Sequence, residues 1–215
     1  SIIGGGRVEA SNSGIGKAGD IFITAKDLVE VVGSSSLIAA NVAPQNSSNP
    51  ITPELISGDG GNVTINTSQL IVRDGAEISV STFGQGDAGN LSILANNIKI
   101  DGGENGVLTG FFASVEEGAT GQGGSINIGS EQSFVEELSI TNGAEISVSS
   151  LGQGKAGELG INANALNLDN NAVISSQSES TFEAGNITLN IANSLEAKDS
   201  EISTSSTQSS GGNLT

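Results

Sequence analysis

The sequence predicts an all-β chain that coils as a right-handed parallel β-helix, and three observations lead to this prediction. First, a short signature recurs seven times along the 215 residues: a small residue, Gly, a polar residue and an apolar-x-apolar pair. Second, apolar and polar residues alternate within each repeat, which is the period of a strand with one buried face. Third, no stretch has the 3.6-residue apolar spacing of a helix. We expect about seven coils of three short strands each.

The signature sets the length of one repeat. Its glycine stands at positions 19, 61, 89, 124, 157, 185 and 212, and the shortest spacings are 27 and 28 residues. A longer phrase shows the same regularity, because the twenty residues from Asp74 and the twenty from Asn142 are identical at fourteen positions without a gap. Internal repeats of this length indicate a solenoid in which each unit packs on its neighbours.

The register of the repeats favours stacked parallel strands over an antiparallel meander. Equivalent residues of a parallel coil lie about 4.8 Å apart in adjacent turns, so identical residues form ladders. The isoleucines expected in an interior ladder are Ile78, Ile146, Ile174 and Ile202. The serines that follow three of them, beginning with Ser147, are expected to form an exterior ladder. The crossover rule for parallel strands favours a right-handed coil.

Residues 1–215 are expected to form a single β-helix array cut from a longer chain, because the sequence opens and stops within the repeat pattern. Loop insertions are expected near 41–59, 106–122 and 130–137. The first contains all three prolines, which cannot donate to a strand ladder. In the repeat that starts at Ala184, Ser194 stands where an apolar residue is expected, so we predict an irregular strand there.

Charge and composition exclude several classes of function. Seven Lys and Arg stand against 24 Asp and Glu, and the net charge of −17 opposes binding to nucleic acid or to an anionic membrane surface. No apolar run approaches the roughly 20 residues that span a bilayer, so we expect no membrane insertion. Because Cys is absent, the chain has no disulfide framework and no thiolate metal site.

The phrases GAEISVSTFGQGDAGNLSI, GGNVTINTSQLIVRDGAEIS and FFASVEEGATGQGGSINI resemble the repeat region of large filamentous-haemagglutinin-like exoproteins, especially the cyanobacterial ones. The resemblance covers essentially the whole chain and implies a right-handed parallel β-helix. It also implies two-partner secretion of the parent chain through a dedicated outer-membrane transporter, and a location at the exterior of the outer membrane. The repeats of that family supply no catalytic residues to carry over.

The expected function is that of a structural and adhesive rod segment of a secreted cell-surface exoprotein. Such a rod extends or presents binding regions, and it can contact extracellular polysaccharide or associate with itself into filaments. The alternative is a polysaccharide-cleaving β-helix enzyme, either a lyase or a hydrolase, acting on acidic glycans. The adjacent acid pairs are Glu116-Glu117 and Glu136-Glu137, but neighbours on a strand point to opposite faces. Without His, Cys or Tyr, we expect no enzyme.

Acidic residues in Gly-rich turns raise the question of a metal. They are Asp59, Asp74, Asp87, Asp101 and Glu104. No run matches a Ca²⁺-binding loop, and Asp-Gly is an ordinary turn sequence, so we expect no cofactor. Weak Ca²⁺ bridging between acidic surfaces stays open. The Gly-Gln-Gly elements do not open a helix, which excludes a dinucleotide site, and we interpret them as turns.

Four phenylalanines are the candidate interaction surface. Phe22 should point outward because it lies between Ile21 and Ile23. Phe83 precedes a Gly-Gln-Gly element, and Phe111 and Phe112 lie in the second insertion. Such groups either pack loops onto the rod or form an exposed apolar patch. Because loops on a rigid scaffold often carry function, we expect any contact with a partner at the insertions.

Overall fold

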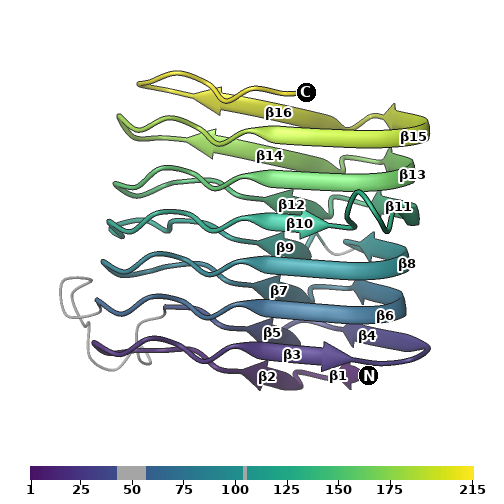
Figure 1. Cartoon of the computed structure of the whole chain (residues 1–215), viewed down its shortest axis with the longest axis horizontal. Coiled ribbons are helices and arrows are strands. Elements are labelled where there is room, and N and C mark those ends of the chain that lie inside the picture. The colour runs from purple at the N-terminus through teal and green to yellow at the C-terminus, as the bar shows by residue number, and fades with distance from the viewer. Residues whose placement is uncertain (43–56, 104–105) are drawn as a thin grey trace.

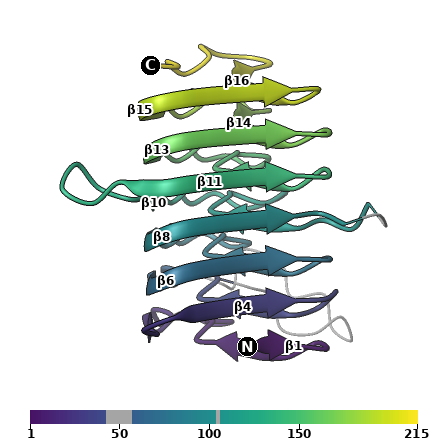
Figure 2. The same ribbon diagram turned by 90° about the vertical axis from the view of Figure 1, so that its right-hand side faces the viewer.

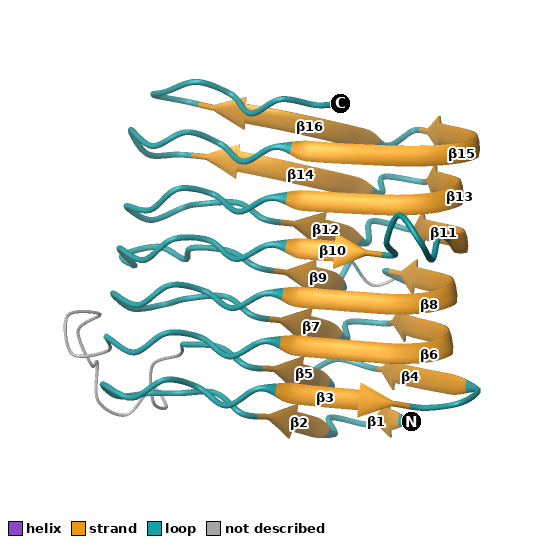
Figure 3. Cartoon of the chain, in the orientation of Figure 1, coloured by secondary structure: helices purple, strands orange, loops and turns teal. Residues whose placement is uncertain are grey.

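The structure is a computed structural model that describes residues 1–42, 57–103 and 106–215. These residues form sixteen strands and no helix (Figure 3), so the all-β prediction is confirmed. Sheet A contains β1 (Ile2–Ile3), β3 (Ile21–Thr24), β4 (Leu28–Val32), β6 (Val63–Arg73), β8 (Leu91–Asp101), β10 (Ile126–Ile128), β11 (Val135–Thr141), β13 (Leu159–Asp169) and β15 (Ile187–Lys198). Sheet B contains β2 (Arg7–Glu9), β5 (Leu37–Ala39), β7 (Glu77–Ser79), β9 (Gly110–Phe112), β12 (Glu145–Ser147), β14 (Val173–Ser178) and β16 (Glu201–Ser206).

The named strands of both sheets pair in parallel, and the chain passes alternately between the sheets. The strands of sheet B lie side by side in sequence order, from β2 to β16. In sheet A, Val63 pairs with Leu91, and Leu159 pairs with Ile187, each at the offset of 28 residues. Figures 1 and 2 show the result as a stack of layers with the two ends of the chain at opposite ends of the stack. This arrangement is compatible with a β-helix.

The long strands of sheet A differ from the three short strands expected in each repeat. β6, β8 and β13 have eleven residues each and curve through the corner where a turn was expected (Figure 1). Between β6 and β8 the register omits one pair, after Thr67 and before Gln69, so the ladder bends without ending. Separate strands occur in the repeats of β3 with β4 and of β10 with β11. A corner that keeps its backbone hydrogen bonds on both sides needs no turn.

One column of sheet B contains all four predicted isoleucines. Ile146 pairs with Ile174, which pairs with Ile202. Ile78 joins the column through Phe111, the partner of both Ile78 and Ile146. Ile78, Phe111, Ile146 and Ile174 have no exposed surface, whereas Ile202 is partly buried against the same core. The apolar interior therefore lies between the two sheets as stacked layers of Ile, Val, Leu and Ala.

The second insertion falls differently from the expectation, and the third projects between β10 and β11. Residues 43–56 of the first lie outside the described residues. Gly110–Phe112 of the second is strand β9 of the regular stack, so the extra residues precede and follow it. In the third, Ser130 and Ser133 form an antiparallel bridge, and the chain from Val135 onward already belongs to β11. Figure 2 shows the connection from β10 to β11 projecting from the stack.

Stacked glycines explain why the signature recurs. A Cβ added to the signature glycine of a repeat would lie well inside 3.0 Å of the carbonyl oxygen of the same glycine one repeat earlier. This holds for Gly61, Gly89, Gly124, Gly157, Gly185 and Gly212. A second column consists of Gly58, Gly86, Gly121 and Gly154, with the same close approach. Gly86 and Gly154, the second glycines of two Gly-Gln-Gly elements, are therefore required by the neighbouring backbone, in addition to forming a turn.

The turns that lead from sheet A to sheet B use residues that tolerate a left-handed backbone. Asp74, Asn142 and Asn170 have φ of 60°, 57° and 54°, and Asp and Asn adopt this conformation more readily than other non-glycine residues. Asn170 Nδ2 donates to Asn142 Oδ1 at 2.7 Å, and Asn142 Nδ2 donates to Asp101 Oδ1 at 2.8 Å. We call this column the amide ladder.

The irregular strand predicted at Ser194 is confirmed. Ala163 pairs with Ile191, but Ala165 pairs with Ser194, so β15 holds an additional residue at this point. The extra residue is a β-bulge, and it restores the register of Leu166 with Leu195.

A matched pair of substitutions in one coil tests the glycine columns. Gly157→Ala is expected to destabilise the fold by about 3 kcal/mol or more, because the added methyl group meets the Gly124 carbonyl oxygen. Gly160→Ala in the same coil meets only the Asn127 side chain, at 3.2 Å, and should stay within about 1 kcal/mol of the natural chain. Urea unfolding followed by circular dichroism measures both. Equal losses in the two variants would contradict a backbone requirement at Gly157.

Candidate functional site

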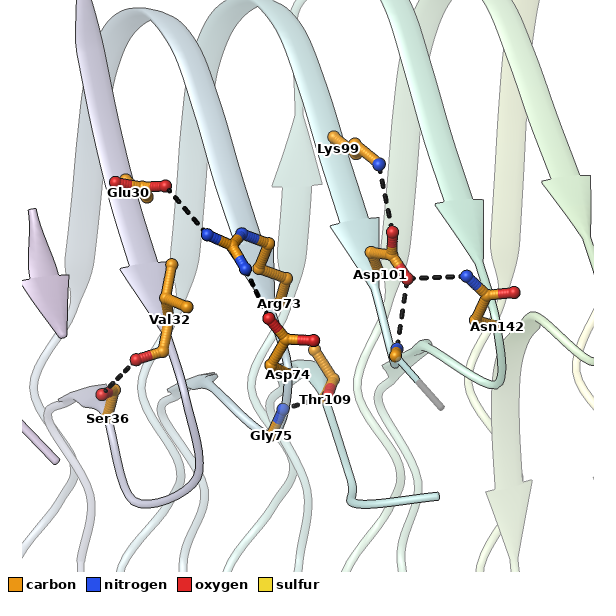
Figure 4. Close-up of polar contacts among 11 residues, drawn as sticks. Glu30, Val32, Ser36, Arg73, Asp74, Gly75, Lys99, Asp101, Thr109 and Asn142 are labelled. Carbon is orange, nitrogen blue, oxygen red and sulfur yellow. Dashed lines mark hydrogen bonds and ion pairs between the residues drawn. The ribbon is translucent and has the colours of Figure 1, made fainter. Parts of the chain in front are cut away.

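The first candidate site is the edge formed by the turns between the sheets, where charged side chains gather (Figure 4). Arg73 lies between two carboxylates: Nη2 is 3.5 Å from Glu30 Oε1, and Nη1 is paired with Asp74. Lys99 Nζ is 3.0 Å from Asp101 Oδ2. Each cation therefore already has a carboxylate partner within the chain, and pairs this exposed add little stability.

Asp101 has the most contacts of the carboxylates at this edge. Burial opposes its ionisation, but hydrogen bonds from Asn142, Lys99 and the Gly103 amide outweigh burial and hold the pKa of Asp101 below its ordinary value. The Asn142 contact is 2.8 Å and the Gly103 contact is 3.1 Å. The carboxylate is thus a structural acceptor that ties two repeats together, since Asn142 belongs to the next coil.

The aspartates considered as Ca²⁺ ligands bind neighbouring parts of the chain. Asp59 Oδ1 accepts a hydrogen bond from the Asp87 amide at 3.2 Å, and Asp87 Oδ1 accepts one from the Gln122 amide at 2.8 Å. Asp74 pairs with Arg73, and Glu104 lies outside the described residues. Within the described part of the chain, no three acidic side chains come together in a group that could hold a metal ion.

The second candidate site is on the outward face of sheet B. We call it the serine recess and define it by Ser79, Ser81, Ser114, Ser147 and Ser175. These side chains face away from the core, because Ser175 Oγ donates to the partly exposed Glu145 carboxylate at 3.2 Å. Their exposed fractions are nevertheless only 1% to 6%. The expected exterior serine ladder therefore exists at Ser147 and Ser175, but it is recessed. Its third member, Ser203, pairs in register with Ser175, and its hydroxyl is buried without a hydrogen-bond partner among the described residues.

The serine recess satisfies its own hydrogen bonds. Ser79 Oγ and the Ser81 amide both donate to Asn41 Oδ1, at 3.0 and 2.9 Å. The Ser114 amide donates to Ser81 Oγ at 3.1 Å, and Ser175 Oγ donates to Ser147 Oγ at 3.2 Å. Since side-chain oxygens of one repeat accept backbone N–H groups of the next, the recess stabilises the stack. The chain contains no His that could activate these hydroxyls.

Two carboxyl groups beside the recess have unusual environments. Val115 forms parallel β-bridges with Thr82 of the preceding repeat and with Ser150 of the following one. The next residue, Glu116, therefore lies in register between Phe83 and Leu151. Burial, and then the charge of Glu77, raise the pKa of Glu116. Burial also raises the pKa of Glu77, against the opposing charge of Arg7. Clustered carboxyls with raised pKa are a feature of acid–base sites as well as of crowded surfaces.

The acid pairs predicted from sequence are not brought together. Glu116 is half-buried and its neighbour Glu117 is exposed. Glu136 and Glu137 lie on β11 in sheet A, away from the recess on sheet B. The proximity of Glu116 to Glu77 has no signal in the sequence, because these residues are 39 positions apart and meet only through the stacking of their coils.

The candidate phenylalanines do not form one surface. Phe22 on β3 is 75% exposed and points outward, and Phe83 is half-buried. Phe111 is fully buried and Phe112 is 9% exposed, so the expectation that they lie in an exposed insertion is wrong. The reason is that Phe111 occupies the isoleucine column of sheet B, where it replaces a smaller side chain.

The third candidate site is a groove on the outward face of sheet A. It has a volume of 420 Å³ and is lined by Ser125, Asn127, Glu158, Leu159, Gly160, Asn186 and Thr188. Sequence reasoning missed this groove. The available signal was the departure of the segment AGELGI from the related segment AGNLSI at two positions, which become Glu158 and Gly160.

Comparison with protein-family models, with curated proteins and with solved structures finds no match for this chain. Among the described residues there is also no helix with the length and apolar character needed to cross a bilayer.

Replacing Glu116 by Gln tests its environment. A raised pKa means that the folded chain binds the proton more tightly than the unfolded chain, so Glu116 opposes folding at neutral pH and does so less as the pH falls toward the ordinary pKa of 4.5. Glu116→Gln should therefore unfold at a higher temperature than the natural chain at pH 7, and this gain should shrink toward pH 4.5. Glu117→Gln is the matched exposed control; the same gain in both variants would contradict a specific effect of burial.

The amide ladder is tested by Asn142→Gly, which keeps the left-handed backbone at no steric cost and removes only the amide. Loss of two hydrogen bonds should destabilise the fold by about 1–3 kcal/mol in urea unfolding. The pKa of Asp101, followed by carboxyl NMR, should rise because it loses a donor. An unchanged Asp101 titration would show that Asn142 does not stabilise the carboxylate.

Proposed function

We propose that this chain is a segment of a right-handed parallel β-helix of about seven coils, which acts as a structural and adhesive rod within a secreted cell-surface exoprotein. The observation that carries the proposal is the stacking of identical residues in register. Isoleucines, serines, glycines and amides each align with their equivalents in the next repeat. A stack of this kind grows by adding repeats and holds its surface in a fixed geometry.

Three further features support a rod rather than a compact enzyme. Each repeat adds about 4.8 Å, so seven repeats give a length of roughly 35 Å. The charged and polar groups described above bind one another between repeats, which leaves few of them for chemistry. The crossover rule supports the right-handed coil.

The cellular setting of the proposal comes from the resemblance to filamentous-haemagglutinin-like repeats. In this setting the parent chain crosses the outer membrane through a two-partner secretion transporter and remains at the cell surface. The net charge of −17 suits an extracellular surface that stays solvated and avoids nucleic acid. Self-association into filaments and contact with extracellular polysaccharide are the interactions proposed for such a rod, and weak Ca²⁺ bridging is the only role proposed for a metal.

A second candidate is a glycan-cleaving enzyme, and one observation favours it. Glu77 and Glu116 lie near each other, both with a raised pKa, and Arg7 acts on Glu77. A protonated carboxyl can serve as a general acid, and a cation can neutralise a uronate. The recess lacks a third carboxyl grouped with them in the described residues, which favours the rod.

Incubation with acidic and neutral polysaccharides, first with Ca²⁺ and then with EDTA, separates the two functions. The assay follows both retention of the chain on each polysaccharide and release of new reducing ends or unsaturated products. The rod proposal expects retention on some polysaccharide without product release. Glu77→Gln and Glu116→Gln serve as controls: products that disappear in both variants would reject the rod in favour of the enzyme. Absence of retention on every polysaccharide would reject the adhesive part of the proposal.

A further inference from the structure

Two columns of side chains on the outward face of sheet A depart from the repeat near the coil of β13. The first is a column of Asx residues that accept a backbone N–H from the next repeat. The Asn62 amide donates to Asp20 Oδ1 at 2.8 Å, the Asn90 amide to Asn62 Oδ1 at 3.0 Å, and the Ser125 amide to Asn90 Oδ1 at 2.9 Å. Among the described residues, the side chains of Ser125 and Glu158, at the next two positions of the column, accept no such hydrogen bond. The pattern resumes at Asn186, whose Oδ1 accepts a hydrogen bond from the Asn213 amide at 2.9 Å.

The second column loses a side chain at Gly160. Its partners in register are Asn127 on one side and Thr188 on the other. Gly160 lacks the positive φ that would require glycine, and an added Cβ would meet only Asn127 Oδ1, at 3.2 Å. Gly157, three residues earlier, would instead meet a backbone carbonyl oxygen. Glycine weakens a strand interior and often marks a close approach by a ligand, so the fold does not account for Gly160.

Together these departures create the groove of Ser125, Asn127, Glu158, Gly160 and Thr188. The side chains of Asn127, Glu158 and Thr188 are exposed, and within the described part of the chain they have no hydrogen-bond partner. This differs from the serine recess, where the hydroxyls are bonded to one another. The groove therefore offers unsatisfied donors and acceptors around a floor of bare backbone.

We propose that this groove binds one neutral sugar unit of a polysaccharide, an inference that rests on the adhesive role proposed above. The amide and the hydroxyls both donate and accept, as sugar hydroxyls require. The Glu158 carboxylate accepts from a pair of sugar hydroxyls, whereas no basic side chain lines the groove to bind a uronate or a phosphate. The glycine floor admits the ring close to the strand. A peptide strand would need an open sheet edge, and this groove lies on a sheet face.

Residues 1–215, with their sequence unchanged, are titrated with cellohexaose, maltohexaose and mannohexaose, and with alginate and chitosan hexamers as charged probes. Amide NMR shifts report binding, and chromatography of each mixture reports cleavage. At least one neutral hexamer should shift the signals of Asn127, Gly160 and Thr188, and the alginate hexamer should not. No shift with any neutral hexamer, or stronger binding of a charged hexamer, would overturn the proposal.

Two variants restore the repeat and remove the groove. Gly160→Thr introduces the threonine that the next repeat has at position 188, and its side chain fills the groove. Glu158→Asn restores the asparagine found at positions 62 and 90. Each should weaken sugar binding by about tenfold or more, which is the loss of one to two hydrogen bonds. Thr64→Ser, in the same column but outside the groove, is the matched control and should bind as the natural chain does.

Folding does not confound the test, because both variants move toward the repeat pattern and should unfold at the same or a higher temperature than the natural chain. Unchanged affinity in Gly160→Thr would overturn the proposed groove while leaving the rod intact. Cleavage of a hexamer would instead reject the rod function, independently of where the sugar binds.

Discussion

The close approach of equivalent backbone segments in successive repeats is the constraint on which this structure depends. At two glycine columns the carbonyl oxygen of one repeat occupies the space that a Cβ of the next would need. This contact fixes the position of each repeat on its predecessor, so residues 28 positions apart become partners in both sheets. The isoleucine column, the serine recess and the amide ladder all follow from that register, since each requires equivalent residues directly above one another.

The same register determines what the surface can do. An oxygen or amide that recurs in every repeat finds its partner in the next repeat, as Asn142 does with Asp101 and Asn170. Repetition therefore converts polar residues into structural hydrogen bonds. A polar side chain that departs from the repeat has no equivalent in the next repeat to bond with, so it stays available to a ligand. Glu116, Glu158 and Gly160, which differ from the equivalent residues of other repeats, are accordingly more informative about function than the segments that recur within the chain.

The class of fold was readable from the sequence, because periodic alternation and an ungapped repeat report directly on stacked parallel strands. The irregularity at Ser194 was readable for the same reason. Two features were not. Phe111 has the local context of an insertion, and only the pairing of β9 with β7 and β12 shows that it fills the isoleucine column. The raised pKa of Glu116 depends on a neighbour 39 positions earlier, Glu77, and a distance in space of this kind leaves no local pattern.

The two departures have opposite relations to stability, and this difference bears on which of them serves binding. Glu116 is held where burial and Glu77 oppose its charge, so the folded chain loses stability at neutral pH by keeping it ionised. Gly160 loses only the small contribution of one exposed side chain, and the polar groups around it stay open to solvent. A rod that presents a surface to a partner is better served by the second arrangement, because the groove is formed in advance by rigid strands and needs no rearrangement of the stack.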